Sequence, residues 1–139
     1  CKVGNNVIIA NNVPLGGHVT IEDSVVIGGN SAVQQFTRIG RLAMIGGMTG
    51  VLKDVIPFGL SIGNRNYLQG LNLIGLRRKK YDNKKIMALS KAYNDIFASQ
   101  NFHENLNKIN GEHEGNELVS EVITFIEKDK KRPICSPQS

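Results

Sequence analysis

An aliphatic residue recurs at every sixth position through the first half of the chain, and this repeat restricts the fold more than any other feature. The fourth residue after each aliphatic is always small or β-branched, and a glycine often follows the aliphatic directly. The nine repeated residues are Val3, Ile9, Leu15, Ile21, Ile27, Val33, Ile39, Ile45 and Val51. This pattern is typical of hexapeptide repeats that fold as a parallel β-helix.

Each six-residue unit of such a repeat forms a short strand and a corner, and three units close one triangular coil. The aliphatic side chains fill the interior, while glycine or asparagine at the corners supplies backbone conformations with positive φ. Nine units predict three coils over residues 1–62, with Gln35 stacked one coil above Gly17. Pro57 cannot donate a hydrogen bond to a strand ladder, so we expect the β-helix to end there.

The second half of the chain has the three- and four-residue spacing of amphipathic helices. Residues 82–99 follow Asp82 and Asn83, both favoured N-cap residues, and predict a first helix. A second apolar set spans residues 102–109 and precedes a polar turn, Asn110–Gly115. A second helix that ends at this turn is therefore expected, as part of a three-helix cap.

A third apolar set covers residues 118–126, with Asn116 as its N-cap. Residues 82–139 are therefore predicted to form a C-terminal helical cap. The tail, residues 128–139, contains two prolines and is expected to be frayed.

Residues 63–81 form a basic connector between these two regions. Its five bases, without any acid, are Arg65, Arg77, Arg78, Lys79 and Lys80. Residues 1–62 carry four bases and three acids, and residues 81–139 carry eight bases and nine acids, so the connector accounts for the net charge of +5. A local basic cluster indicates a local anionic partner.

The remaining composition excludes several classes of protein. The longest uncharged run, Val3–Ile21, contains asparagines, glycines, a proline and a histidine, so neither a membrane span nor a signal peptide is indicated and a cytoplasmic location is expected. Cys1 and Cys135 lie at opposite ends without metal-binding spacing, so we expect free thiols and no metal site. No cofactor and no nucleic-acid partner are expected. Because the chain begins with cysteine, it is expected to be the C-terminal part of a longer one.

The sequence resembles the acyltransferase family that begins lipid A synthesis, in which a 3-hydroxyacyl chain passes from acyl carrier protein to the 3-hydroxyl of UDP-N-acetylglucosamine. The similar segments are Cys1–Val19, Ile27–Phe36, Ile45–Val51 and Ile62–Tyr81. Hexapeptide repeats occur in many transferases, whereas the last segment, IGNRNYLQGLNLIGLRRKKY, is specific. The resemblance implies an O-acyltransferase with a left-handed parallel β-helix, about three coils of it in this chain, and a homotrimer with active sites between neighbouring β-helices.

The same resemblance implies catalytic roles. The family's general-base histidine precedes the segment that begins at Cys1, so the base is expected upstream of this chain. Gly17 matches the position whose backbone N–H stabilises the oxyanion, and His18 matches an active-site histidine that helps to place the substrate. Gln35 matches a glutamine that contacts the sugar. Gln34 stands where other members carry a histidine.

The connector of this family binds the nucleotide. Asn72, Arg78 and Lys79 match that stretch, where an amide can read the uracil or ribose and cations can neutralise the diphosphate. Lys79 stands where arginine is commoner, and Ile74 replaces an acid found in some members. The same basic cluster can steer the acidic acyl carrier protein.

The resemblance also places an acyl groove between neighbouring β-helices. Gly47 matches the residue that sets its length, and Met44 is a second lining residue. Because glycine leaves the groove open, a long chain of roughly hydroxymyristoyl size is favoured. Phe36, Leu42 and Met48, together with Met44, would be exposed apolar surface in a single chain, which favours the homotrimer.

Three alternatives remain open. The first is another hexapeptide acyltransferase, such as the later N-acyltransferase of the same pathway or a sugar acetyltransferase that uses acetyl-CoA. The second is a zinc β-helix related to carbonic anhydrase, which needs three imidazoles, although His18 is the only histidine in residues 1–80. The third is an inactive truncated product. These 139 residues alone are expected to show no turnover, because the general base is expected upstream of Cys1 and such a base typically raises the rate about 10²–10⁴-fold.

Overall fold

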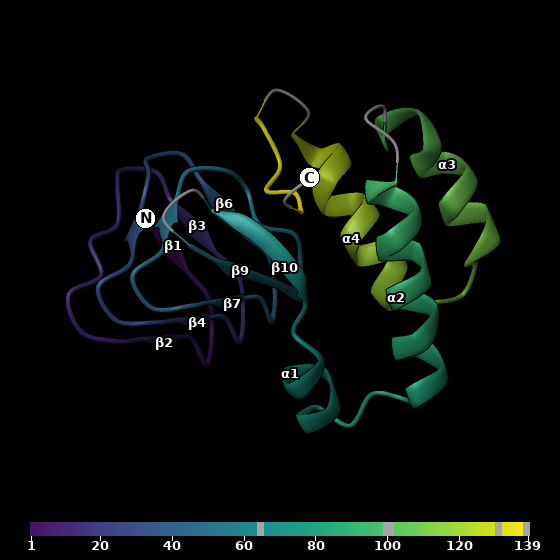
Figure 1. Ribbon diagram of the computed structural model, residues 1–139, viewed down its shortest axis with the longest axis horizontal. Coiled ribbons are helices and arrows are strands. Elements are labelled where there is room, and N and C mark those ends of the chain that lie inside the picture. Colours follow the sequence, from purple (N-terminus) through teal and green to yellow (C-terminus); the bar gives the residue numbers. More distant parts are fainter. Residues whose placement is uncertain (64–65, 99–101, 130–131, 138–139) are drawn as a thin grey trace. The chain divides into compact units, whose positions relative to one another are not determined.

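The computed structural model describes residues 1–63, 66–98, 102–129 and 132–137, apart from the side chains of residues 102–104. It contains two compact units (Figure 1). The first comprises Cys1–Asn72 together with Lys131–Ser139, and the second comprises Leu73–Lys130. The expected boundaries followed residues 62 and 81, whereas the observed boundary follows Asn72. Arg65 of the basic connector lies outside the described residues.

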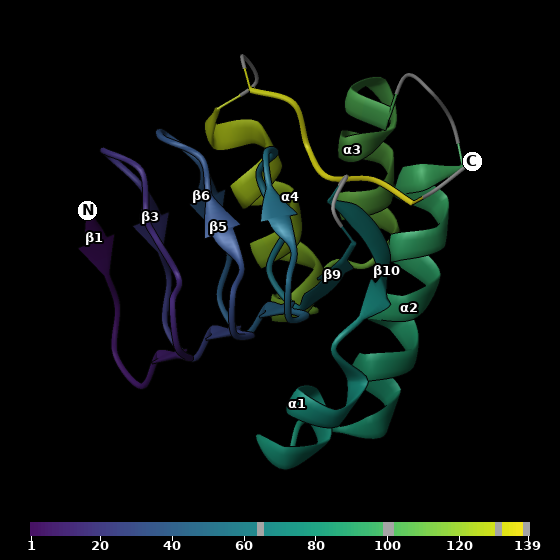
Figure 2. The ribbon, with the colours of Figure 1, turned by 60° about the vertical axis from the view of Figure 1, so that its left-hand side comes forward.

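The first unit is a solenoid of very short parallel strands. They are β1 (Lys2–Val3), β2 (Ile8–Ile9), β3 (Thr20–Ile21), β4 (Val26–Ile27), β5 (Ala32–Val33), β6 (Arg38–Ile39), β7 (Met44–Ile45) and β8 (Gly50–Val51). Val3 pairs with Ile21, and Ile21 pairs with Ile39, so neighbouring strands are 18 residues apart. Figure 2 shows β1, β3 and β6 lying side by side in successive coils. The predicted solenoid of about three coils is therefore confirmed.

The repeated aliphatic residues form the solenoid core. In the inner coils their side chains are fully buried, as at Ile27, Ile39 and Ile45. In the first coil the same position is open, and Val3 is 48% exposed, because β1 is the edge strand of its sheet. Burial of each such side chain contributes about 1.5–3 kcal/mol, which explains why the repeat tolerates only aliphatics here.

The corners of the coils use glycine differently from the expectation. Positive φ occurs at non-glycine residues: Asn6, Asn12, His18, Ser24, Asn30, Phe36, Leu42 and Met48. Glycine is needed instead beside the next coil, since a Cβ on Gly16, Gly28 or Gly40 would lie 2.4 Å from a backbone nitrogen of that coil. The expected role in positive φ is thus correct for asparagine and wrong for these glycines, whose missing side chain permits close packing of backbones.

A hairpin ends the solenoid. β9 (Gly59–Ile62) pairs in parallel with β7, but its Leu60 lies opposite Met44 after only 16 residues, so the six-residue period has stopped. β10 (Tyr67–Leu71) then pairs antiparallel with β9. The six-residue period therefore ends at Pro57 as expected, but the chain stays in the sheet beyond it, because β9 still offers the ladder its own donors and acceptors.

The described part of the tail, residues 132–137, returns to the first unit and is not frayed. Ile134 forms a parallel bridge with Asp54, and the Cys135 N–H donates to the Asp54 carbonyl over 2.7 Å. Cys135 is buried and Cys1 is exposed, and both are free thiols as predicted. The expectation of a frayed tail was wrong because backbone pairing, rather than an apolar pattern, holds this strap (residues 132–137) in place.

The second unit is helical. It contains α1 (Leu73–Arg78), α2 (Asn83–Phe97), α3 (Phe102–Glu112) and α4 (Glu117–Lys128), and Figure 1 shows α2, α3 and α4 side by side. The predicted N-caps are confirmed, since Asp82 accepts a hydrogen bond from the Lys84 N–H and Asn116 accepts one from the Leu118 N–H. α1 was not anticipated, and α3 continues into the region expected to be a turn. No helix in the described ranges is long and apolar enough to cross a membrane.

Candidate active-site groove

Two adjacent coils of the solenoid form an open groove of about 550 Å³. It is lined by Pro14, Leu15, Gly16, Gly17, Ala32, Val33, Gln34, Gln35, Gly50 and Leu52. The 18-residue register brings Gln35 one coil beyond Gly17, so the groove gathers three of the positions singled out in the sequence. The groove offers main-chain polar groups, the side-chain amides of Gln34 and Gln35, and apolar side chains in its lining. Such a lining suits a polar head group joined to an apolar chain.

Gly17 presents an accessible backbone N–H in this groove. Its carbonyl accepts a hydrogen bond from the Phe36 N–H over 2.9 Å, whereas its own N–H has no partner within the described chain. A Cβ built on Gly17 would meet nothing within 4 Å, and its φ lies outside the left-handed region. The fold therefore does not require glycine here, in contrast to Gly16 beside it, and a free N–H donor is what an oxyanion needs.

His18 occupies the corner next to Gly17 and lines a different hollow. Its φ is 58°, and its exposed ring lies flat against the ring of Phe36, with centroids 4.9 Å apart. The hollow that it lines, of about 330 Å³, is shared with Cys1, Lys2 and Thr20 and not with Gln35. Sequence reasoning missed Phe36 as a partner of His18, although the 18-residue repeat could have revealed it.

The two residues assigned to the acyl groove lie on the solenoid surface. Met44 in β7 is 39% exposed, and Gly47 is an exposed corner residue. A Cβ on Gly47 would meet the Gly29 carbonyl oxygen at 3.5 Å, an ordinary contact, so the fold accepts a side chain there. Phe36 and Met48 are exposed as expected. Leu42 is only 4% exposed, contrary to the expectation, although its corner has positive φ as do those of Phe36 and Met48.

The nucleotide-binding candidates are divided between the units. Asn72 ends the first unit, and its Nδ2 donates to the Leu42 carbonyl over 2.9 Å. Arg78 ends α1 in the second unit and Lys79 follows it, both with exposed side chains. Ile74, also in α1, is 65% exposed. The structure thus gathers Gly17, Gln34 and Gln35 in one groove, and Arg78 and Lys79 at one helix end.

The hexapeptide-repeat solenoid places the chain among hexapeptide-repeat proteins, and a free N–H donor beside amide side chains in a surface groove suits the acyltransferases of this class. The family model described as "Udp N-acetylglucosamine O-acyltransferase; Domain 2" matches residues 54–135. The chain therefore belongs to the UDP-N-acetylglucosamine O-acyltransferase family.

Curated relatives extend this similarity to the repeat. The chain is 46% identical over 138 residues to the acyl-(acyl-carrier-protein)–UDP-N-acetylglucosamine O-acyltransferase of Rhizobium leguminosarum bv. trifolii, covering 99% of this chain and 51% of that protein. It is likewise 46% identical over 139 residues to the enzyme of the same name from Caulobacter vibrioides, covering 99% of this chain and 53% of the relative. The chain spans about half the length of the curated relatives that it matches.

Solved structures agree with the sequence comparison. The UDP-N-acetylglucosamine acyltransferase of Arabidopsis superposes with a TM-score of 0.89 at 37% identity, over 97% of this chain and 50% of that chain. The UDP-N-acetylglucosamine O-acyltransferase of Moraxella catarrhalis gives a TM-score of 0.88 at 35% identity, over 96% of this chain and 52% of that chain. The left-handed parallel β-helix with C-terminal helices, expected from the resemblance, is confirmed.

Proposed function

We propose that the full-length protein transfers a 3-hydroxyacyl chain from acyl carrier protein to the 3-hydroxyl of UDP-N-acetylglucosamine, the reaction that begins lipid A synthesis. The single observation that supports this most is the match of 99% of the chain to O-acyltransferases whose names specify this donor and acceptor. The groove of Gly17 and Gln35 supplies a chemically suitable place for the transfer.

In this reaction the sugar hydroxyl attacks the thioester carbonyl and a C–O bond forms. When the tetrahedral intermediate collapses, the C–S bond breaks, and the carrier thiolate leaves and takes up the proton that the base had removed. The negative charge on the carbonyl oxygen is stabilised by a hydrogen bond that the Gly17 N–H donates, because this N–H donates to no described residue. The proton of the hydroxyl goes to a general base, which the resemblance places before Cys1. His18, held by Phe36, helps to place the sugar next to that base.

The polar part of the substrate requires amides and cations. Gln35 offers an amide donor and acceptor to the sugar hydroxyls in the groove. Arg78 and Lys79 offer exposed cations to the diphosphate, and the same positive charge attracts acyl carrier protein. Asn72 belongs to the same nucleotide-binding stretch, where its bond to the Leu42 carbonyl fixes the orientation of the amide.

The apolar part of the substrate requires a groove between copies of the chain. Met44 lines it, and Gly47 leaves it long because no side chain closes it, although the fold accepts one there. A homotrimer follows from this arrangement, since Phe36 is 51% and Met48 is 75% exposed in the single chain. We place the enzyme in the cytoplasm, where acyl carrier protein is found.

The test is an assay of the full-length protein with 3-hydroxyacyl carrier proteins of different chain lengths and UDP-N-acetylglucosamine. The expected product, identified by mass spectrometry, is the 3-O-acylated sugar nucleotide, with the long acyl donor preferred. Parallel reactions contain acetyl-CoA as donor or a 3-O-acylated glucosamine nucleotide as acceptor. Product in those reactions alone would reject the proposal and favour a sugar acetyltransferase or the later N-acyltransferase.

A further inference from the structure

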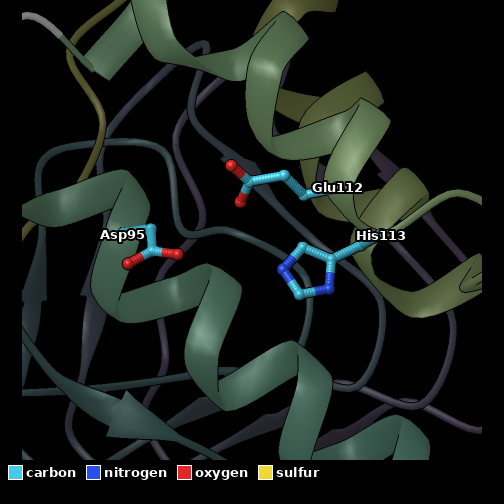
Figure 3. A group of neighbouring side chains, drawn as sticks. All are labelled: Asp95, Glu112 and His113. Atoms are coloured by element: carbon cyan, nitrogen blue, oxygen red, sulfur yellow. The ribbon is translucent and has the colours of Figure 1, made fainter.

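We propose that Asp95, Glu112 and His113 form a divalent-cation site of the zinc type in the helical unit. Asp95 lies in α2, Glu112 is the last residue of α3, and His113 follows it directly. The ligand atoms of the three side chains all lie within 4.8 Å of one another. Figure 3 shows the two carboxylates and the imidazole extending into the space between α2 and the end of α3.

The imidazole of His113 points to a ligand independently of this clustering. Its Nε2 atom is buried and makes no hydrogen bond. In Figure 3 the ring nitrogen farther from the main chain is directed toward Asp95. A buried ring nitrogen is normally satisfied by a donor, an acceptor or a metal ion. An ion between His113 and Asp95 would satisfy it.

The distances fit a bridging ion better than direct contact. His113 Nε2 makes no hydrogen bond with either carboxylate, so neither is its present partner. Zinc binds nitrogen and oxygen at about 2.0–2.2 Å, which places tetrahedral ligand atoms about 3.4 Å apart. The ligand atoms lie up to 4.8 Å apart, so rotation of the side chains is enough to bring them to this spacing. Glu112 is exposed and Asp95 is half-buried, so both can rotate without moving a helix.

Charge and surroundings also favour a cation. Two carboxylates place two negative charges beside the ring, and neither Asp95 nor Glu112 forms a salt bridge within the described part of the unit. One imidazole and two carboxylates suit Zn²⁺ with water as the fourth ligand. A hollow of about 480 Å³ adjoins His113 and is lined by polar residues including Asn110, Asn116 and Ser120, which gives water access.

A bound ion would join α2 to the turn that follows α3, and so would stabilise the helical unit. The sequence does not show this site, because Asp95 is separated from Glu112 by most of a helix and lacks a standard ligand spacing. Only the packing of α2 against α3 brings the three ligands together.

The experiment titrates ZnCl₂ into the tag-free, chelator-treated full-length protein by calorimetry, with MgCl₂ and MnCl₂ in parallel. We expect one Zn²⁺ per chain that depends on these residues, a raised melting temperature, and a shift of the His113 ring nitrogens in long-range ¹H–¹⁵N spectra. His113→Ala and Asp95→Asn should each weaken binding by at least about tenfold. Glu114→Gln, on the same turn and exposed, is the matched control and should bind as the wild type does.

Absence of zinc binding by the wild type would overturn the site, as would binding of equal affinity in the wild type and in His113→Ala. The second outcome would mean that other groups, such as Cys1 or His18, hold the metal. If His113→Ala fails to fold, the test is the zinc affinity of Glu112→Gln. The exposed Glu112 carboxylate is dispensable for packing, and its loss should still weaken zinc binding. Unchanged affinity in Glu112→Gln would then reject the proposal.

Discussion

The imidazole of His18 and the phenyl ring of Phe36 are stacked, with centroids 4.9 Å apart and ring planes only 4° from parallel. The two residues are one coil apart in the register, and both lie at corners with positive φ, 58° and 66°. Such pairs contribute about 0.5–1.5 kcal/mol beyond their buried area. The orientation of the imidazole is therefore set by a residue of the next coil as well as by its own backbone.

Phe36→Leu should lower kcat/KM for acyl transfer by roughly fivefold, which corresponds to loss of about 1 kcal/mol of ring stacking. Phe36→Tyr keeps the ring and should retain most of the activity. The measurements are steady-state kinetics of the full-length protein and the proton shifts of the His18 ring, which should change in the leucine variant only. Kinetics of Phe36→Leu that equal the wild type, combined with an impaired His18→Ala, would show that the stack does not position His18.

Gly17→Ala should leave the fold intact and impair catalysis. The added methyl meets nothing within 4 Å of the folded chain, but it stands beside the N–H and hinders close approach of the thioester carbonyl, so kcat should fall by roughly 10²-fold, as when an oxyanion donor is lost. Gly16→Ala is the structural control, because its Cβ would lie 2.4 Å from the Gln35 nitrogen and should lower the melting temperature. Equal activity of Gly17→Ala and the wild type, measured with saturating donor, would remove Gly17 from the proposed mechanism.

The repeat made the solenoid and part of its groove predictable. Once Val3, Ile21 and Ile39 are known to stack, simple counting places Gln35 above Gly17. Counting says nothing of main-chain angles, so it could not show that the positive-φ corners fall on residues such as His18 and not on the glycines that follow the aliphatics.

Contacts that depend on packing rather than on period could not be predicted. The strap is held by backbone pairing of Ile134 with Asp54, and a lone isoleucine between prolines carries no periodic signal. The same limit applies to Asp95 and His113, which come together only because α2 packs on α3. Periodicity reports which face of an element is buried, but not which elements then meet.

Arg78→Ala should raise the KM for UDP-N-acetylglucosamine by about tenfold, because a charge-assisted hydrogen bond to phosphate contributes about 1.5–3 kcal/mol. Its kcat at saturating nucleotide sugar should change less. Lys84→Ala, an exposed cation in the first turn of α2, serves as the control and should behave as the wild type. A KM for Arg78→Ala within twofold of the control would reject the assignment of Arg78 to the diphosphate.

Asp54→Asn should destabilise the first unit by about 3–5 kcal/mol, because it breaks a buried ion pair and leaves cations without their charge partner. The Asp54 carboxylate is fully buried, and it accepts hydrogen bonds from Arg38 Nε over 2.8 Å and Arg132 Nε over 3.1 Å. Arg132→Gln should cost less, since Arg38 remains. Urea denaturation of the full-length protein measures both, and equal midpoints for the two variants would contradict this order.

Cys135 belongs to the strap and joins a polar cluster with Ser61 and Asn66. Its thiol donates to the Asn66 carbonyl over 2.8 Å and lies 3.7 Å from the Ser61 hydroxyl. Burial raises the pKa of the Cys135 thiol to about 11, because the thiolate would lose its hydration, and the hydrogen bond with Ser61 offsets only part of this effect. The folded protein therefore holds the thiol proton more tightly than the unfolded chain, in which a cysteine has a pKa of about 8.5.

Folding stability should consequently decrease as the pH rises above about 8.5. Below that value both the folded and the unfolded protein keep the thiol proton, so Cys135 contributes no pH dependence. Above it the unfolded chain loses the proton first. The free energy of unfolding therefore falls until the folded thiol titrates near pH 11. At about 1.4 kcal/mol per pKa unit, the rise from about 8.5 to about 11 makes the total loss about 3–4 kcal/mol. Cys135→Ser keeps a donor of similar size that does not titrate there, so the difference between the two proteins in urea denaturation isolates the thiol. A difference that stays constant between pH 7 and pH 10.5 would show that Cys135 ionises equally easily in both states.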